Sequence, residues 1–466
     1  MIMEITPFLN RELSEPLYSQ LYHWIKKEIE EGRLLHGMKM PSIRQLATHL
    51  KVSRNTVVTA YQQLESEGYL ESVPKSGIWV AEIEKAALHP MEKVIPVRQE
   101  WKSSNETLIN FEYGNIDLEK FPLKLWKKCI SDVVSQNNNW LFEYGEKQGE
   151  FSLRQEISKY LLQSRGVHCT PEQIIITSGT QNSISLICHL LNLQQEKVAI
   201  EEPGYNGVRN VFENEGCHME PVPLEKDGLS LEHVHLSKAK AVYITPSHQF
   251  PFGMILSISK RIKLLNWAYQ TGGYIIEDDY DSEFRYKGQP IPSLKSLDEE
   301  ERVIYLGTFS KSFLPSIRLS YMVLPPSLLD QYTQNFRNYN QSASPIIQRA
   351  MALFMESGEF ERHIRRMRKK YQRKHQTLIK SIEQNMGSKV RIIGEDAGLH
   401  ILLKLNTVSC FELIETALQK GVQVHSPLKF WLHPTSESHP YIMLGFGGLS
   451  IEEIEKGIQL LASCLP

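Results

Sequence analysis

Five stretches of the sequence run from apolar residues directly into a polar turn. They are QIIITSGTQ, KVAIEEPGY, AVYITPSHQFPFG, YIIEDDYDSEF and VIYLGTFSKSF. Short apolar runs bounded by turn residues are typical of buried strands. From about residue 107 such runs alternate with helical patterns, which predicts an α/β unit with a mostly parallel sheet. Ligands of these sheets bind beyond the carboxyl ends of the strands, so we expect the five turns to surround one pocket.

Two of the turns carry groups that bind phosphate. Gly179 and Thr180 open a predicted helix, and a helix N-terminus offers backbone N–H groups and the positive end of a dipole. Arg318 follows Lys311 by seven residues in TFSKSFLPSIRL. Its guanidinium can donate two parallel hydrogen bonds to phosphate oxygens. These residues predict a site for a phosphorylated ligand.

The other turns add an amine from Lys311, an aromatic ring from Tyr205 and a carboxylate from the stretch EDDYD. Pyridoxal 5′-phosphate needs all of these groups. Its aldehyde forms a Schiff base with a lysine, and its ring acts as an electron sink when a carboxylate keeps the pyridine nitrogen protonated. Taken singly, each motif has a plainer interpretation, as a surface lysine, a turn, a solvated acidic loop or a cation site.

The stretch YIIEDDYDSEF offers several carboxylates for the pyridine nitrogen. We expect Asp278 to face it, with Tyr280 on the same face of the strand because side chains alternate, and the Tyr280 hydroxyl near the ring O3′ atom. Asp279 is then expected to point away. The remaining carboxylates are expected to be solvated or structural: Glu277, Asp281 and Glu283.

The first eighty residues have a different pattern. Apolar residues at helical spacing predict three helices, with Ser42 and Ser53 as N-caps of the second and third. The strands YLESV and IWVAE, joined by PKSG, predict a hairpin with Lys75 at its tip. The third helix leaves Arg54, Asn55 and further polar side chains off its buried stripe, and these types contact bases and phosphates.

Three helices and a basic hairpin make a winged helix-turn-helix. Residues 32–64 contain five Lys or Arg and no Asp or Glu, so one face is expected to be positive and to bind double-stranded DNA. A small helical domain for protein interaction is the alternative. We assign residues 12–80 to this domain, 81–106 to a linker, and 107–466 to the α/β unit, with a small subdomain from about 340 to 466.

Whole-chain properties narrow the class of protein. The net charge is −2 and the six cysteines show no C-x-x-C spacing, so we expect no disulfide, no metal site and only a local DNA-binding surface. We find no signal peptide and no apolar run long enough to span a membrane, which favours a cytoplasmic protein.

The segment MPSIRQLATHLKVSRNTVVTAYQQLESEGYLESVPKSGIWV resembles the GntR-type winged helix, and residues 107–466 resemble fold-type I aminotransferases. The combination is similar to the MocR/GabR family of bacterial regulators over essentially the full chain. The resemblance implies that Lys311 is the Schiff-base lysine, Asp278 and Tyr280 the partners of the pyridine nitrogen and O3′, and Tyr205 the stacking ring. The implied phosphate contacts are Gly179, Thr180, Ser310 and Arg318. The implied DNA contacts are Arg44, Arg54, Thr56, Lys75 and Gly77, to which the exposed pattern adds Asn55.

Some positions depart from the family pattern. Aminotransferases place an Asn beside O3′ near His248 and Gln249, where the turn here is longer. In the family pattern, arginines that bind a substrate carboxylate stand at the positions of Gly448 and Gly207. Because glycine cannot replace them, we expect both carboxylate-binding arginines to be absent here, with Arg209 and Arg391 as alternative candidates. We therefore predict that GABA is not the effector and that any transamination is weak.

The predicted function is a PLP-dependent transcription regulator that senses an amine or amino-acid effector, or PLP itself, by exchange at Lys311. The alternative is an active aminotransferase with an accessory DNA-binding domain. The resemblance implies a head-to-tail homodimer. The basic segment 362–374 is interpreted as a solvated helix packed through Ile364, Met367 and Tyr371, or as a second DNA contact.

Overall fold

A computed structural model describes residues 7–83, 108–117, 119, 121–135, 139–287, 291–406, 409–435 and 440–465. The chain forms two compact units, Met1–Ser103 and Ser104–Pro466, which are described separately. Most of the predicted linker, 84–106, lies outside the described residues.

The first unit is a three-helix domain with a hairpin. Its elements are α1 (Leu17–Glu30), α2 (Ile43–Leu50), α3 (Arg54–Ser66), β1 (Leu70–Val73) and β2 (Gly77–Val80). Ser42 forms a capping box with Gln45, and the Ser53 hydroxyl accepts from the backbone N–H of Thr56. The two strands pair antiparallel. The predicted winged helix-turn-helix fold is confirmed.

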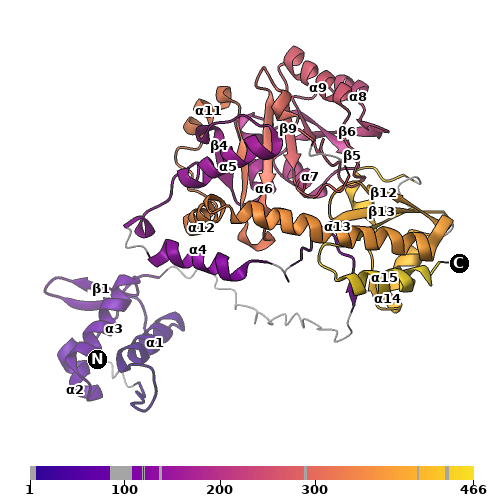
Figure 1. The fold of residues 1–466 in the computed structure, drawn as a ribbon. Coiled ribbons are helices and arrows are strands. Elements are labelled where there is room, and N and C mark those ends of the chain that lie inside the picture. The colour runs from indigo at the N-terminus through magenta and orange to yellow at the C-terminus, as the bar shows by residue number, and fades with distance from the viewer. Residues whose placement is uncertain are drawn as a thin grey trace. The chain divides into compact units, whose positions relative to one another are not determined.

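The second unit is built on an eight-stranded sheet (Figure 1) in the order β4-β11-β10-β9-β8-β5-β6-β7. The strands are β4 (Ile174–Thr177), β5 (Lys197–Glu202), β6 (His218–Glu225), β7 (Gly228–Leu229), β8 (Ala241–Ile244), β9 (Tyr274–Asp279), β10 (Val303–Thr308) and β11 (Ser320–Val323). Strands β10, β9, β8, β5 and β6 are parallel, whereas β11 and β7 pair antiparallel with their neighbours.

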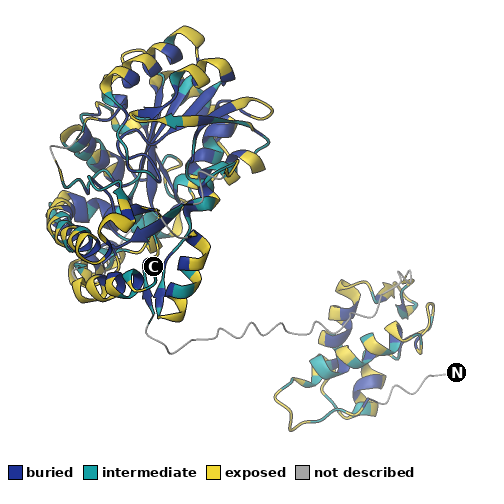
Figure 2. Cartoon of the chain, turned by 90° about the vertical axis from the view of Figure 1, so that its right-hand side faces the viewer, coloured by how far each residue is buried: buried dark blue, intermediate teal, exposed yellow. Residues whose placement is uncertain are grey.

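Helices cover both faces of this sheet. Side chains of β9 alternate between the faces: Ile275 packs in the cluster of α8 and α9, and Ile276 in the cluster of α6, α7 and α11. The helices are α4 (Leu123–Ser135), α5 (Phe151–Arg165), α6 (Thr180–Leu190), α7 (Asn206–Asn214), α8 (Leu231–Ser237), α9 (Ile258–Thr271), α10 (Phe309–Ser312), α11 (Leu329–Asn335) and α12 (Pro345–Glu356). Figure 2 shows the central strands buried and the outer helix faces exposed, as expected of a doubly covered parallel sheet.

The small C-terminal part contains two further sheets. Its elements are α13 (Glu359–Met386), β12 (Val390–Ile393), β13 (His400–Leu405), α14 (Cys410–Gln419), β14 (Val422–Gln423), β15 (Tyr441–Gly445) and α15 (Ile451–Ala462). β12, β13 and β15 form one sheet, and β14 pairs with β3 (Ile109–Asn110) from the start of the unit. The helix α12 packs instead in the core of the large sheet. The small part therefore combines segments from both ends of the unit.

The fold class predicted from the sequence, a winged helix with a fold-type I aminotransferase-like body, is confirmed. Among the described residues, no helix is both long and apolar enough to cross a membrane. In the same residues, no group of three or more His, Cys, Asp or Glu side chains is arranged to hold a metal ion.

Candidate cofactor site and DNA-binding surface

One cavity of about 190 Å³ in the second unit brings the predicted cofactor residues together. All eight line it: Gly179, Thr180, Tyr205, Asp278, Tyr280, Ser310, Lys311 and Arg318. Six residues not singled out from the sequence complete the lining: Tyr113, Gln181, Tyr243, Thr245, Phe250 and Thr308. Each of the five polar turns contributes to the wall, because the strands that precede them end at the same edge of the sheet.

One end of the cavity has the features of a phosphate site. Gly179 is the N-cap of α6, with φ +138, and a Cβ atom there would collide with the guanidinium of Arg318. Glycine therefore lets the arginine approach the helix N-terminus. The hydroxyl of Thr308 accepts from the backbone N–H of Ser310 at 3.2 Å, which fixes the turn that carries Lys311. Backbone N–H groups and a guanidinium converge here as an anion requires.

Lys311 lies deeper, with its Nζ atom 4.1 Å from the centroid of the Tyr113 ring. Burial lowers its pKa to about 8, although the nearby Asp281 acts in the opposite direction. A larger fraction of this amine is therefore neutral near pH 7 than of an ordinary lysine with a pKa of about 10.4. A neutral amine is the nucleophile that a cofactor aldehyde requires.

Asp278 occupies the cavity wall on the α6 side of the sheet. Its Oδ2 atom accepts from the Tyr243 hydroxyl at 2.6 Å, whereas its buried Oδ1 atom has no hydrogen-bond partner in the structure. Burial raises its pKa to about 7, with Tyr243 lowering it and Asp279 and Asp281 raising it further. A protonated ring nitrogen would supply both the missing donor and a positive charge. The residues present fit pyridoxal 5′-phosphate.

The turn after β8 differs from the sequence expectation. Neither His248 nor Gln249 is among the residues that line the cavity; Phe250 lines it instead. The Gln249 amide donates to the Pro203 carbonyl at 2.9 Å. The His248 Nδ1 atom lies 2.9 Å from the Tyr280 hydroxyl and 3.0 Å from an Asp281 oxygen, so His248 and Asp281 support Tyr280 from behind.

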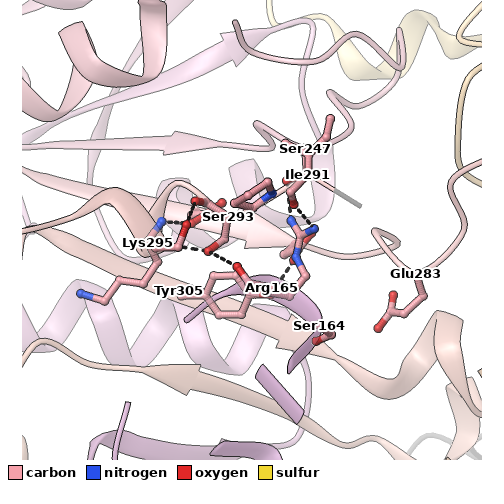
Figure 3. A network of polar contacts seen from close by, with 12 residues as sticks. Ser164, Arg165, Ser247, Glu283, Ile291, Ser293, Lys295 and Tyr305 are labelled. Atoms are coloured by element: carbon pink, nitrogen blue, oxygen red, sulfur yellow. Dashed lines mark hydrogen bonds and ion pairs between the residues drawn. The ribbon is translucent and has the colours of Figure 1, made fainter. Parts of the chain in front are cut away.

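The other carboxylates of the acidic stretch are structural. Glu277 accepts from the backbone N–H groups of Leu294 and Lys295, each at 2.7 Å. Asp279 accepts from the Arg165 guanidinium at 2.6 Å and from the Tyr305 hydroxyl. Figure 3 shows this network, with Arg165 also reaching Ser247 and Ile291.

Strand alternation explains why these carboxylates differ. Glu277 and Asp279 continue the face of β9 that carries Ile275, while Asp278 continues the face of Ile276. The Tyr160 hydroxyl donates to Glu283, which is half-buried. The sequence leaves two alternatives, solvated or structural, open for Glu277, Asp281 and Glu283. Since Glu277 and Asp281 are buried and Glu283 is half-buried, the structural alternative fits all three.

Of the two positions at which the family pattern places a carboxylate-binding arginine, Gly207 lies beside the cavity residue Tyr205 and Gly448 does not line the cavity. A Cβ atom on Gly207 would meet the Tyr205 ring at 2.6 Å. Gly448 lies outside the cofactor cavity, in a separate hollow lined by Lys370 and Lys374. Position 448 is therefore not where an arginine could bind a ligand carboxylate in this cavity, and the expectation that placed the family arginine there is wrong. The reason is that β15 ends at Gly445, before this position.

The two possible substitutes are not among the cavity residues either. Arg209 is half-buried and donates to the Lys429 carbonyl at 3.0 Å. Arg391 is exposed on β12. Within the described part of the chain, the cations lining the cavity are Lys311 and Arg318.

In the winged helix, the side chains of Arg44, Arg54, Asn55 and Lys75 are exposed. Thr56 is half-buried and its hydroxyl lies 2.9 Å from that of the cap Ser53, so it also stabilises the start of α3. At the hairpin, Gly77 has φ +116, and a Cβ atom there would lie 3.0 Å from Lys39. Lys39, which precedes α2, stacks over the Trp79 ring of the hairpin and is a basic residue beside the wing that the sequence did not single out. The contact between Lys39 and the hairpin joins segments that are distant in the sequence, so no sequence pattern indicated it.

The basic segment 362–374 lies within α13. Ile364, Met367 and Tyr371 are buried, as the packing interpretation predicted. Arg368 is half-buried and donates to the Glu283 carbonyl at 2.8 Å, while the buried Lys374 pairs with Asp117. Lys370 is half-buried and also pairs with Asp117, at 2.7 Å. The remaining basic side chains of the segment are exposed: Arg362, Arg365, Arg366, Lys369 and Arg373.

Comparisons with known proteins agree with this architecture. Residues 17–80 match the family "Bacterial regulatory proteins, gntR family", and residues 106–436 match "Aminotransferase class I and II". The HTH-type transcriptional regulator YdeL of Bacillus subtilis is 42% identical over 98% of this chain and 99% of its own length. The probable rhizopine catabolism regulatory protein MocR of Rhizobium meliloti is 32% identical over 98% and 95%.

A solved kynurenine aminotransferase of Pyrococcus horikoshii, in complex with PMP, superposes with a TM-score of 0.69 at 25% identity, covering 77% of this chain and 91% of its own. Together these findings define a DNA-binding transcription regulator with an aminotransferase-like, PLP-binding body. The chain belongs to the MocR/GabR family of such regulators.

Proposed function

We propose that this protein binds pyridoxal 5′-phosphate through Lys311 and changes its action on DNA when an amine effector, or PLP itself, arrives at that site. The observation that carries the proposal is a lysine with a pKa of about 8 in the same cavity as a buried, unpartnered carboxylate oxygen of Asp278. When bound, the cofactor supplies an aldehyde for amines and an electron-withdrawing ring.

The remaining roles follow from position. Gly179, Thr180, Ser310 and Arg318 hold the phosphate, Tyr205 stacks on the ring, and Tyr280, braced by His248, donates to O3′. The proposal is supported by their common cavity and by the contact between Tyr280 and His248.

We further propose that the winged helix reads operator DNA through Arg44, Arg54, Asn55, Thr56, Lys75 and Gly77. The domain assignment is 12–80 for this reader, 81–106 for the linker and 107–466 for the sensor. We infer a head-to-tail homodimer acting in the cytoplasm, where the linker transmits movement of the body to the reader. GABA is not the effector, because Arg318, the arginine that lines the described cavity, is assigned to the cofactor phosphate and does not bind a ligand carboxylate.

The first test compares the visible absorption spectrum of the purified protein with PLP in the wild type and in Lys311→Ala. We expect a visible band that the variant loses and that borohydride reduction fixes covalently in the wild type. Lys369→Ala is the matched control, because Lys369 is exposed on α13. A band that persists in Lys311→Ala would contradict the assignment of Lys311.

An active aminotransferase with an accessory DNA-binding domain is the second candidate function. The observation that favours it is the retention of both the lysine and the buried aspartate in one cavity. Multiple turnover with any pair of amino donor and keto acid would support this candidate, and we expect none above a weak half-reaction.

A further inference from the structure

We propose that the aromatic part of the cofactor cavity, lined by Tyr113, Tyr205 and Phe250 and called the effector chamber below, selects amines that have an apolar or aromatic body and no carboxylate. This inference rests on the proposed function and names the ligand class of the same site. It depends on the aromatic side chains of the cavity, on the charges around it, and on the strands of the small part that pack in the cluster of Phe250.

The first observation is an aromatic cluster centred on Phe250, which lines the cavity. Ring centroids lie 5.1 Å from Tyr113, 5.8 Å from Tyr205 and 6.0 Å from Tyr280. Phe430 lies 4.6 Å away and His400 5.4 Å away. Aromatic faces of this kind attract ammonium groups and bury apolar bodies.

The second observation is the sign of the charge around the chamber. Asp278 lines the cavity, and two further buried carboxylates stand behind its wall: Asp281 and Glu201. Glu201 accepts from the Thr245 hydroxyl at 2.7 Å. With Asp278 assigned to the ring nitrogen, Asp281 and the partly protonated Glu201, whose pKa burial raises to about 7, still disfavour another carboxylate in a buried site.

Of the two described cations that line the cavity, Lys311 is assigned to the cofactor aldehyde, which leaves Arg318. Arg318 is at the phosphate end, against Gly179. Burial lowers the pKa of His400 to about 4, so this ring is neutral at pH 7, and its Nε2 atom lies 2.9 Å from the Pro251 carbonyl. A buried carboxylate without a paired cation is strongly disfavoured.

The third observation is the apolar face that the small part presents. In the paired strands β13 and β15, Leu402 lies opposite Met443. Both are buried and pack in the cluster of Phe250 and Phe430, whereas the neighbours Ile401, Leu403, Ile442 and Leu444 pack in the other core. Met443 therefore faces the cluster that contains the cavity residue Phe250, and it carries no charge.

The test titrates the PLP-loaded full-length protein with ligand pairs that differ by one carboxylate. The pairs are phenethylamine with phenylalanine, and propylamine with 4-aminobutyrate. Binding is followed by the visible absorption change and by calorimetry. We expect the amine of each pair to bind at least about tenfold more tightly. Equal or tighter binding of the amino acid, or no binding of either amine, would overturn the inference.

The variant Met443→Arg brings a guanidinium to the same cluster, with Met443→Leu as the matched apolar control. We expect the ratio of amino-acid to amine affinity to rise about tenfold or more in the arginine variant and to stay unchanged in the leucine variant. An unchanged ratio in a folded arginine variant would contradict the inference. If the arginine variant does not fold, the wild-type ligand pairs decide alone. If the wild type showed no absorption band that depends on Lys311, the proposed function itself would be contradicted, so the two failures are distinguishable.

Discussion

At the scale of the residue, Asp278 illustrates how the fold gives different roles to neighbouring carboxylates. It lies between Glu277 and Asp279 in the chain, yet those two accept from backbone N–H groups and from Arg165, while one oxygen of Asp278 has no partner. The same logic applies to Lys311, which differs from the exposed lysines in its burial.

The lowered pKa of Lys311 predicts the pH dependence of cofactor attachment. Since the neutral amine is the nucleophile, the rate at which PLP attaches to the apoprotein should fall as pH decreases through about 8. Stopped-flow absorbance against pH measures this rate, with Lys311→Ala as the baseline. A rate that continues to rise to about pH 10, the range of an ordinary lysine, would show that burial does not lower this pKa.

Gly179 gives a second prediction at this scale. Gly179→Ala should weaken PLP binding by about tenfold or more, because the added Cβ displaces Arg318 from the phosphate site. Gly272→Ala is the matched control, since Gly272 also has a positive φ, +70, but nothing within 4 Å of the added atom. Backbone strain should cost Gly272→Ala about 1 kcal/mol of stability, and Gly179→Ala about 1–3 kcal/mol, because its φ of +138 and ψ of +163 are essentially restricted to glycine. Fluorescence titration with PLP would contradict the prediction if the two variants bound equally.

At the scale of the element, the start of α3 has to be rigid for its N-terminal residues to meet a DNA groove. The Ser53 hydroxyl accepts from the Thr56 backbone N–H at 3.1 Å, and α3 packs through Val57, Tyr61 and Leu64. The cap and the buried stripe together fix the direction in which Arg54 and Asn55 project.

Ser53→Ala should therefore destabilise the first unit by about 1 kcal/mol, the usual value of a lost N-cap. Thr59→Ala, on the exposed side of the same helix, is the control for a hydroxyl that makes no cap and should change the free energy of unfolding by less than about 0.5 kcal/mol. Urea denaturation followed by circular dichroism measures both. Equal stability of the two variants would rule out the capping role.

The helix α13 gives a prediction on DNA binding. Its buried stripe through Ile364, Met367 and Tyr371 explains the helix by packing within the body. We therefore expect the charge reversals Lys369→Glu and Arg373→Glu, both at exposed positions, to leave unchanged the salt dependence of binding to a duplex selected from a random pool. A flatter dependence would reveal a second DNA contact on the body. Arg54→Glu serves as the positive control, because it should weaken binding.

At the scale of the whole molecule, the chain forms two compact units with separate cores. Arg54→Ala should weaken binding to the selected duplex by about tenfold and leave the PLP absorption band unchanged. Conversely, Lys311→Ala should abolish the band and keep basal DNA affinity, while removing the response to an effector. Fluorescence anisotropy with labelled duplex, with and without amine, measures both effects. Loss of DNA binding in Lys311→Ala would show that the cofactor is required for the reader rather than for its control.

Much of the fold was predictable because it depends on local patterns. Neighbouring residues determine the apolar stripes and caps of α2 and α3 and the order of strands and polar turns. These patterns therefore predicted the winged helix and the parallel sheet. The eight predicted cofactor residues all line one cavity, because parallel strands carry their turns to one edge.

What the sequence alone determined was therefore which chemical groups the protein possesses and at which end of the sheet they meet. The tertiary structure decided the rest: that Phe250 rather than His248 lines the cavity, that Gly448 lies in another hollow, and that Met443 of β15 packs in the cluster of Phe250 and Phe430. It also brought Ile109 and Asn110 to β14, and Lys39 to the hairpin. These contacts join segments distant in the chain, and no local pattern encodes the packing of one segment against another.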